Sequence, residues 1–219
     1  MIEAILPAGV AVAESFGDPP GVRLFPEEAA AIRRAVDKRR REYATVRHCA
    51  RRALADLGLP PVAILNGTGR EPMWPAGVVG SMTHCDGYRA AALAPVGVVA
   101  SLGIDAEPHA PVSEGLLPLI GRPDELPRLA ALAAAYPEVH WDRLLFSAKE
   151  SVYKAWYPLA RRWLGFEEAR LDFHPGPRAF TVTLHQAGPQ IGGRALTAMR
   201  GRWLVQDGLL VTAVVIGSG

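Results

Sequence analysis

Residues 78–107 read VVGSMTHCDGYRAAALAPVGVVASLGIDAE. This stretch contains three apolar runs of β-strand character, Val78–Met82, Tyr88–Leu93 and Val96–Ile104. We predict that each run forms a strand and that the last two, which flank Pro95, pair as a hairpin. Two carboxylates separated by one residue, Asp105 and Glu107, follow the third run, so we expect charged groups at the end of a buried strand.

A long helical stretch lies upstream of these strands. Pro26-Glu27-Glu28 is typical of a helix start, because proline is tolerated in the first turn and early carboxylates complement the positive helix end. Gly58, ahead of Pro60, ends the stretch. It is longer than an ordinary globular helix, so we expect a break near Lys38 into two helices. A short strand is predicted at Val62–Leu65. The apolar helix positions recur at steps of three and four residues: Tyr43, Val46, Ala50, Ala53, Leu54 and Leu57.

A proline-rich connection leads to a second helix and more strands. The prolines between residues 108 and 127 permit short helices at most, and a longer helix is predicted from Glu138 to Trp156. The strands predicted after it are Ala169–Phe173, Phe180–Leu184, Gly201–Gln206 and Leu209–Ile216. This order predicts an α+β fold of two halves, residues 1–108 and 109–219, each with a helix packed on a mainly antiparallel sheet. No convincing sequence repeat relates the halves.

The composition fits a globular protein with an uneven charge distribution. The chain has 219 residues, of which 49% are hydrophobic and 21% charged, so it can bury a core in one domain or in two small ones. The net charge is only +2, yet basic residues crowd one early segment. They are Arg33, Arg34, Lys38, Arg39, Arg40, Arg41, Arg47, Arg51 and Arg52. This cluster suits a phosphate-bearing ligand or an acidic partner, or is a solvated helix face.

The N-terminal residues resemble a signal peptide only superficially. The stretch MIEAILPAGVAVAES is apolar, but it lacks a positive leading region and carries Glu3 and Pro7. A buried strand pair with a turn near Pro7–Gly9 accounts for it better. No apolar run is long enough to cross a membrane, and two cysteines make no disulfide framework. We therefore expect a cytoplasmic protein.

Two carboxylates define the first candidate site. Asp105 and Glu107 are at i and i+2 of a predicted strand, so they project from the same face. Two carboxylates at close range repel each other unless a cation or a proton intervenes, and hard oxygen ligands suit Mg²⁺. The alternative is an ordinary solvated strand end.

A second candidate lies in FSAKESVYK, residues 146–154. Glu150 and Lys154 are four residues apart on the predicted helix and share a face. A surface ion pair is the simple interpretation. The pair sits, however, inside an apolar run between Phe146 and Trp156, where a carboxylate could complete a metal site and an ammonium could meet a phosphate.

A third candidate is GSMTHC, residues 80–85. His84 follows a strand and could bind phosphate, act as a base or be structural. The pairs His48-Cys49 and His84-Cys85 suggest zinc, but adjacent residues diverge and the usual ligand spacing is absent. A Cys–His nucleophile lacks a third group to orient it.

Together these segments resemble the Sfp-type 4'-phosphopantetheinyl transferases, in the branch that includes the enterobactin-synthase component and its actinobacterial relatives. Residues 146–154 fit the family pattern W/F-x-x-K-E-x-x-x-K, and residues 80–85 look like its G-S-x-x-H-C segment. Residues 39–51 look like its R-R-x-x-(F/Y)-x-x-x-R-x-x-A-R stretch. Trp141-Asp142 and Arg162-Trp163-Leu164-Gly165-Phe166 also fit. The resemblance spans residues 24 to 173.

The resemblance implies a pseudo-twofold pair of similar halves, which form one cooperative unit with coenzyme A between them. It implies an enzyme of the holo-[acyl-carrier-protein] synthase type, which transfers 4'-phosphopantetheine to a serine of an apo acyl or peptidyl carrier protein. Asp105, Glu107 and Glu150 would hold Mg²⁺, or Mn²⁺, against the pyrophosphate. Glu150 would also be the base, and Lys154 would steady the leaving 3',5'-ADP.

The resemblance also implies contacts to coenzyme A. His84 and Ser81 would contact its phosphates, and Arg39 and Arg47 would clamp the 3'-phosphate. Close relatives often carry a lysine near the adenine, in the loop before the G-x-P-like segment of the family. In the present chain this loop reads NGTGREP from residue 66, and Arg70 is the candidate substitute on the adenine side.

Other classes make different predictions. A metal-dependent phosphohydrolase would use the same carboxylates but would need no carrier protein. A nucleic-acid-binding module would use the basic helix, although a net charge of +2 and the lack of a recognised motif speak against it. We expect no nucleic-acid or membrane partner and a monomer.

Overall fold

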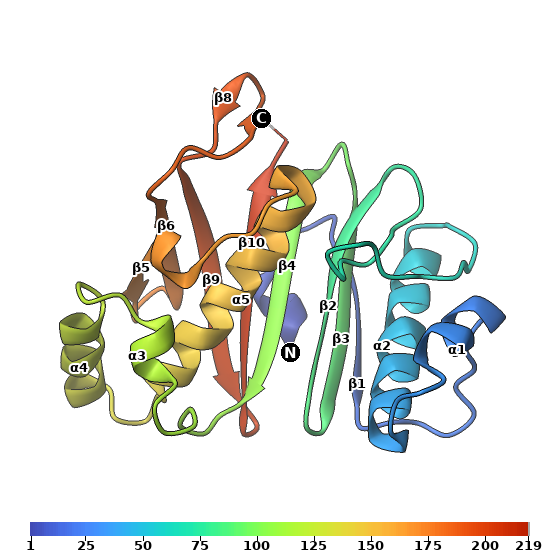
Figure 1. Cartoon of the computed structure of the whole chain (residues 1–219), viewed down its shortest axis with the longest axis horizontal. Coiled ribbons are helices and arrows are strands. Elements are labelled where there is room, and N and C mark those ends of the chain that lie inside the picture. The colour runs from blue at the N-terminus through green and yellow to red at the C-terminus, as the bar shows by residue number, and fades with distance from the viewer. Residues whose placement is uncertain (219) are drawn as a thin grey trace.

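The computed structural model describes residues 1–218 and is built on two antiparallel sheets (Figure 1). The first sheet has the strand order β1-β3-β2, and the second has the order β4-β10-β9-β6-β5. The strands of the first are β1 (Ala11–Phe16), β3 (Tyr88–Pro95) and β2 (Val78–Cys85). Those of the second are β4 (Val99–Pro108), β10 (Leu209–Gly217), β9 (Ala198–Gln206), β6 (Ala179–Leu184) and β5 (Ala169–His174). A short pair, β7 (Gln190–Ile191) and β8 (Arg194–Ala195), lies apart.

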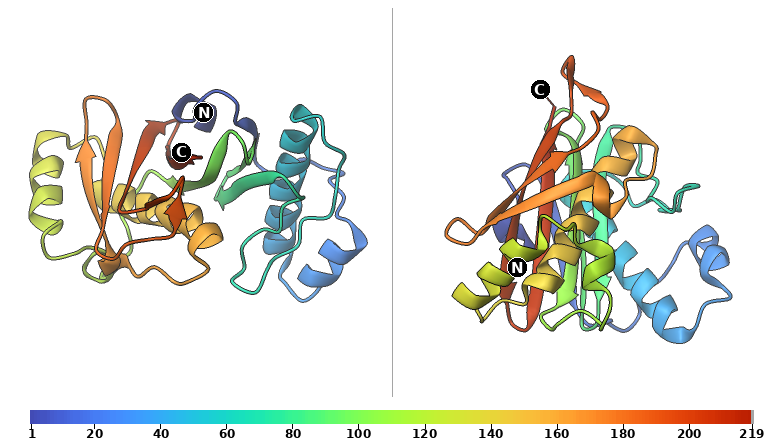
Figure 2. Two further views of the ribbon diagram at one scale, coloured as in Figure 1. Left: turned by 90° about the horizontal axis from the view of Figure 1, so that it is seen from above. Right: turned by 60° about the vertical axis from the view of Figure 1, so that its left-hand side comes forward.

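Each sheet carries one long helix, as the view from above shows (Figure 2). Helix α2 (Asp37–Asp56) covers the first sheet and follows the short α1 (Pro26–Ile32), so the predicted break near Lys38 is confirmed (Figure 1). Helix α5 (Trp141–Ala160) packs on β4 and β10. The smaller elements are η1 (Ile2–Ile5), α3 (Leu117–Ile120), α4 (Leu126–Ala135) and η2 (Phe166–Glu168). A mixed fold of helices on antiparallel sheets is therefore confirmed, whereas the twofold relation between halves stays a prediction.

The core follows from the apolar faces of these elements. The helix residues Cys49, Ala50, Ala53 and Leu54 of α2 are buried against the first sheet, as the step of three and four predicts. The large side chains of α5, Trp141, Leu144, Val152 and Trp156, are buried against the second sheet. A third cluster lies between the sheets, where the small residues Ala90, Ala92 and Ala94 of β3 meet Leu102 and Ile104 of β4.

The predicted hairpin between β3 and β4 is wrong. β3 pairs with β1 and β2, while β4 pairs with β10 over a register that runs from Pro108↔Leu209 to Val99↔Gly217. The chain crosses from one sheet to the other after Pro95. Both edges of β3 are already paired, with β1 and with β2, so β4 has no free edge of β3 to join and lies beside β2 instead. β4 therefore belongs to the sheet of the second half, although it precedes residue 108; the division at that residue stays a prediction.

Two short predicted strands are also absent from the described residues. Residues 2–5 form a 3₁₀ helix, so only Ala11–Phe16 of the predicted N-terminal strand pair is a strand. Residues 62–65 are irregular because side chains replace their ladder partners. The Glu28 carboxylate accepts the Ile64 N–H at 2.8 Å, and the Arg47 guanidinium donates to the Ile64 carbonyl at 2.8 Å. Among the helices of residues 1–218, none is both long and apolar enough to span a bilayer.

The two sheets also meet along a seam between β2 and β4. The strands make no backbone ladder there. Instead, the Ser81 hydroxyl accepts the Ile104 N–H at 3.1 Å and the Thr83 hydroxyl accepts the Ala106 N–H at 3.0 Å. Gly103 lets β4 approach α5 closely, because a Cβ there would lie 2.0 Å from the Ser151 carbonyl oxygen. The seam and this close approach bring β2, β4 and α5 together at one place.

Candidate active site

A cleft of about 950 Å³ lies between α2 and β2 on one side and α5 on the other. Its volume is typical of small-molecule sites. All but one of the predicted site residues line it. They are Arg39, Arg47, Arg70, Ser81, His84, Asp105, Glu150 and Lys154, whereas Glu107 lies beyond its wall. Eight of the nine predicted residues therefore line one cleft, although their roles stay predictions.

The Asp105 carboxylate is at the centre of this site. Its side chain is 7% exposed, and its Oδ1 accepts from Lys154 Nζ at 2.7 Å and from the Thr83 hydroxyl at 3.3 Å. Within residues 1–218, Asp105 Oδ2 is buried and has no hydrogen-bond partner. A buried carboxylate oxygen without a donor is costly, so Oδ2 is suited to bind a cation or a donor group.

The negative charge of Asp105 affects the pKa of two further carboxylates, Glu107 and Glu150. Burial, then the neighbouring Asp105, raises the pKa of Glu107, while Arg143 opposes the shift by donating to Glu107 Oε2 at 2.8 Å. Burial raises the pKa of Glu150 as well, Lys154 lowers it and Asp105 raises it. Both glutamates would therefore be stabilised by a cation placed among the three carboxylates.

The chemistry of these side chains fits a hard divalent cation. Within residues 1–218, no three His, Cys, Asp or Glu side chains are arranged as a ready metal cluster. Lys154 and Arg143 instead hold one oxygen each of Asp105 and Glu107. The unpartnered Asp105 Oδ2 and the raised pKa values of Glu107 and Glu150 nonetheless mark a shortage of positive charge. Oxygen ligands of this kind suit Mg²⁺ or Mn²⁺.

Lys154 has a different partner from the one that helix spacing suggests. Glu150 and Lys154 do share a face of α5, and both line the cleft. The ammonium reaches β4, where it donates to Asp105 Oδ1 at 2.7 Å and to the Ile104 carbonyl at 3.2 Å. Among the described side chains, Glu150 has no ion-pair partner within 4.0 Å. Glu150 and Lys154 therefore do not form a surface ion pair. The Lys154 ammonium is held by Asp105, and the Glu150 carboxylate is available to a ligand.

His84 is held in a network of charged groups. Arg39 Nη1 contacts His84 Nε2, and Glu42 Oε2 lies 3.6 Å from His84 Nδ1. A guanidinium donates only, so Nε2 accepts and Nδ1 carries the proton. Burial, then the positive charges of Arg39 and Lys154, lower the pKa of His84 to about 4. His84 is thus a neutral imidazole in the free protein.

This shift predicts an acid-labile contribution to stability. The pKa of His84 falls from 6.5 to about 4 on folding. Between these values the unfolded chain binds a proton that the folded chain does not, so the free energy of unfolding falls on acidification through this window. The loss is at most about 1.4 kcal/mol per pH unit. Urea titrations from pH 7 to 4.5 should show a steeper loss for the wild type than for His84→Gln. Parallel pH curves for the two proteins would contradict the assignment.

The predicted arginine pair divides into an accessible and a buried member. Arg39 is exposed at the mouth of the cleft. Arg47 is buried over the Tyr43 ring and donates to the Ile64 carbonyl and, at 2.9 Å, to Asn66 Oδ1. Burial lowers the pKa of Arg47 to about 10, so it stays charged at neutral pH. Arg47 lines the cleft wall, but its donors already support residues 64–66.

A buried carboxylate explains this local order and was missed from the sequence. Glu28, read as an ordinary first-turn acid, is fully buried; it accepts from Arg51 at 2.9 and 3.1 Å and from the Ile64 N–H. Arg51 is therefore a structural partner of Glu28 rather than part of a solvated face. No local pattern identifies such a residue, because its partners are far away in the sequence.

The loop that departs from the family pattern crosses the cleft. It is closed by a bridge between Asn66 and Pro72. Arg161 of the α5 C-terminus donates to Glu71 Oε1 at 2.7 Å, and Gly69 packs so closely on Tyr157 that a Cβ would clash. Arg70 is exposed on this loop, in a left-handed conformation with φ of 67°. The loop thus connects both sides of the cleft and presents Arg70 to it.

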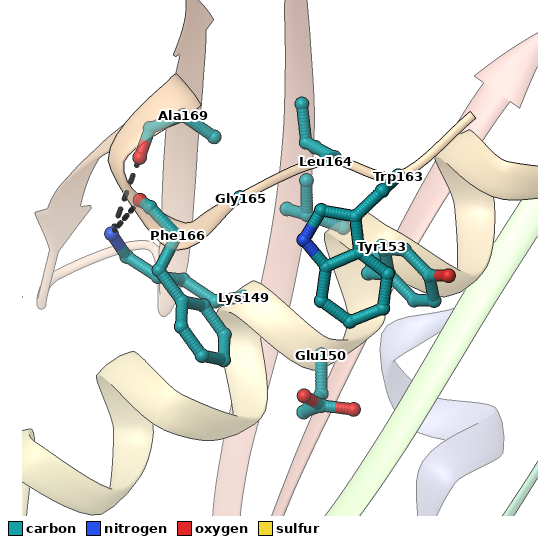
Figure 3. A pocket seen from close by; sticks show the side chains of 9 residues that line it. Lys149, Glu150, Tyr153, Trp163, Leu164, Gly165, Phe166 and Ala169 are labelled. Atoms are coloured by element: carbon teal, nitrogen blue, oxygen red, sulfur yellow. Dashed lines mark hydrogen bonds between the residues drawn. The ribbon is translucent and has the colours of Figure 1, made fainter. Parts of the chain in front are cut away.

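A smaller cavity of about 90 Å³ adjoins the site beside Glu150 (Figure 3). Its walls come from α5 and from residues 163–169, with the Trp163 ring 4.8 Å from that of Tyr153. Lys149 donates to the carbonyls of Phe166 and Ala169, while the Glu150 carboxylate points away from that loop (Figure 3). Glu150, Tyr153 and Trp163 also line the larger cleft, so the two cavities adjoin there.

Comparison with known proteins identifies the family. Residues 27–94 match the family described as the 4'-phosphopantetheinyl transferase N-terminal domain, and residues 101–198 match the 4'-phosphopantetheinyl transferase superfamily. The chain belongs to the 4'-phosphopantetheinyl transferase superfamily.

The relatives support this assignment over the whole chain. The 4'-phosphopantetheinyl transferase Svp of Streptomyces mobaraensis is 53% identical, over 100% of this chain and 90% of its own. The 4'-phosphopantetheinyl transferase PptT of Mycobacterium tuberculosis is 48% identical, over 99% of this chain and 98% of its own. Enterobactin synthase component D of Salmonella typhimurium is 32% identical, over 84% of this chain and 74% of its own. The resemblance stated from the motifs is therefore confirmed.

Proposed function

We propose that this chain transfers the 4'-phosphopantetheine group of coenzyme A to a serine hydroxyl of an apo acyl or peptidyl carrier protein, as a holo-[acyl-carrier-protein] synthase type enzyme. The products are holo carrier protein and 3',5'-ADP. One observation carries the proposal: the cleft brings an acidic centre at Asp105 together with the cationic side chains Lys154 and Arg39. A pyrophosphate with a phosphorus under attack needs both.

The acidic centre is the proposed cation site. Asp105, Glu107 and Glu150 would hold Mg²⁺ or Mn²⁺, with Asp105 Oδ2 as the oxygen that has no other partner within residues 1–218. The cation would neutralise the pyrophosphate charge and so favour attack on phosphorus. Arg143 leaves Oε1 of Glu107 available by binding its Oε2.

Glu150 is the proposed base. The serine Oγ would attack the phosphorus that bears the pantetheine arm, an O–P bond would form, and the bond to the leaving phosphate oxygen would break. The serine proton would pass to Glu150, and the electron pair of the broken bond would stay on 3',5'-ADP. The raised pKa of Glu150, due first to burial, brings this carboxylate closer to the range in which a base works at neutral pH.

The remaining groups are proposed to bind coenzyme A. Lys154 would stabilise the negative charge of the phosphate that leaves with 3',5'-ADP, while Arg39 and Arg47 would bind the 3'-phosphate. His84, neutral in the free protein, would donate one hydrogen bond rather than a charge, and Arg70 would reach the adenine side. We propose no ligand contact for Ser81, because this residue is 3% exposed and its hydroxyl already accepts the Ile104 N–H.

The small cavity suits the pantetheine arm. The arm is slender, with amide groups separated by short alkyl segments, and the cavity combines aromatic walls with the carboxylate of Glu150. Because this cavity opens beside Glu150, an arm placed there would keep its phosphate at the acidic centre. The carrier serine would then enter from the open side of the larger cleft.

The test is the intact mass of an apo carrier protein after incubation with this protein, coenzyme A and Mg²⁺, with an EDTA control. A gain of one phosphopantetheine unit that EDTA prevents is the expected result. Apo carriers from fatty-acid, polyketide and peptide synthesis should be tried. Coenzyme A cleavage without carrier modification would instead indicate a phosphohydrolase. We also propose a cytoplasmic monomer, with no nucleic-acid or membrane partner; light scattering checks the oligomeric state.

A further inference from the structure

Thr83 is the only neutral side chain in the described part of the molecule that hydrogen-bonds to the Asp105 carboxylate. Its hydroxyl accepts the Ala106 N–H at 3.0 Å and donates to Asp105 Oδ1 at 3.3 Å. Thr83 as a whole residue is 3% exposed, so solvent does not compete for these bonds. The hydroxyl has one proton to donate, and accepting the Ala106 N–H leaves that proton directed at the carboxylate.

We propose that Thr83 is a positioning residue for the acidic centre. It belongs to β2, in the first sheet, whereas Asp105 belongs to β4, in the second. Thr83 and Lys154 both bind Oδ1, which fixes the carboxylate plane and leaves Oδ2 for the cation. This inference rests on the proposed cation site and deepens it, because it gives the seam between the sheets a part in metal binding.

The seam itself offers a matched control. Ser81 makes the same kind of bond two residues earlier, since its hydroxyl accepts the Ile104 N–H at 3.1 Å. Ser81 has no bond to Asp105 among the described residues. Loss of either hydroxyl leaves one buried N–H unpaired and weakens the seam, but only loss of the Thr83 hydroxyl releases the carboxylate.

The experiment measures Mn²⁺ binding rather than turnover. Free Mn²⁺ is titrated by electron paramagnetic resonance in the presence of saturating coenzyme A and without carrier, for the wild type, Thr83→Val, Thr83→Ser, Ser81→Ala and Asp105→Asn. Mutating a residue that hydrogen-bonds to a metal ligand typically weakens metal binding about ten- to hundredfold, so the Mn²⁺ Kd of Thr83→Val should rise by about tenfold or more. Thr83→Ser should restore the wild-type Kd. Ser81→Ala should lower Tm but keep the wild-type Kd.

The outcomes separate this inference from the proposed function. A wild-type Kd equal to that of Asp105→Asn would remove the cation site from the proposal and with it the role of Thr83. A tight wild-type Kd, lost in Asp105→Asn but kept in Thr83→Val, would overturn only the Thr83 inference. An equal rise in Thr83→Val and Ser81→Ala would also overturn it, because the seam alone would then matter. Should Thr83→Val not fold, Thr83→Ala is read by the same criteria.

Discussion

Asp105→Asn is expected to reduce phosphopantetheine transfer on the order of 10³-fold, the largest loss from any single conservative change in the cleft. The substitution keeps the size of the side chain but removes its charge. Burial first, and the charge of Asp105 in addition, raise the pKa of Glu107 and of Glu150, and Asp105 Oδ2 has no hydrogen-bond partner within residues 1–218. Several kcal/mol of charge stabilisation would disappear, and each 1.4 kcal/mol is about tenfold in rate.

The measurement is the initial rate of carrier modification at saturating coenzyme A, followed by mass spectrometry over a Mg²⁺ range. Tm and the coenzyme A Kd report whether the variant is folded. Asp172→Asn is the control, because Asp172 is likewise an acid paired with a cationic side chain, Arg170 at 2.7 Å, but it lies on β5 outside the cleft. Near-normal transfer by Asp105→Asn, or an equal loss in Asp172→Asn, would remove Asp105 from the chemistry.

Short-range periodicity correctly predicted which charged residues share a strand and which share a helix face. Asp105 and Glu107 lie on one strand, and Glu150 and Lys154 share one helix face, as the steps of two and four require. What no local pattern shows is which charges meet across elements. Lys154 binds Asp105, forty-nine positions earlier, because Gly103 lets α5 pack directly on β4.

The errors in the predicted fold have the same origin. Proximity in sequence suggested that β3 and β4 form a hairpin, but β4 finds its partner in β10, at the far end of the chain. Likewise, Arg51 looked like a solvated or phosphate-binding arginine, and only the tertiary structure places Glu28 against it. The sequence drew attention to His84 and not to its neighbour Thr83, because the contact of Thr83 with Asp105 crosses the seam between the two sheets.

These long-range contacts also explain why the site is dense in charge yet stable. Two ion pairs lie at the acidic centre: Lys154 pairs with Asp105 at 2.7 Å and Arg143 pairs with Glu107 at 2.8 Å. Each ion pair fixes one oxygen of an acid and leaves the other for a ligand. Binding of coenzyme A and a cation would therefore complete an arrangement whose first contacts are already made.

Lys154→Met is expected to lower kcat about a hundredfold and to raise the coenzyme A Kd less than about threefold. The bound pyrophosphate would carry its charge in the ground state and meet Arg39 as well as Lys154. Extra charge develops on 3',5'-ADP only as the P–O bond breaks, and a positioned donor to such an oxygen is typically worth 10²- to about 10³-fold in rate. Methionine matches the length of the lysine stem without its charge.

The rate should be measured in single turnover with saturating carrier and coenzyme A, and the Kd by calorimetry without carrier. Lys154→Arg should recover part of the rate, because it restores charge at a slightly different position. Lys38→Met is the matched control: Lys38 is 63% exposed and pairs with Asp86, outside the cleft. If the Kd for coenzyme A rises by the same factor as kcat/KM falls, with kcat unchanged, Lys154 binds substrate and transition state equally and does not serve the leaving group.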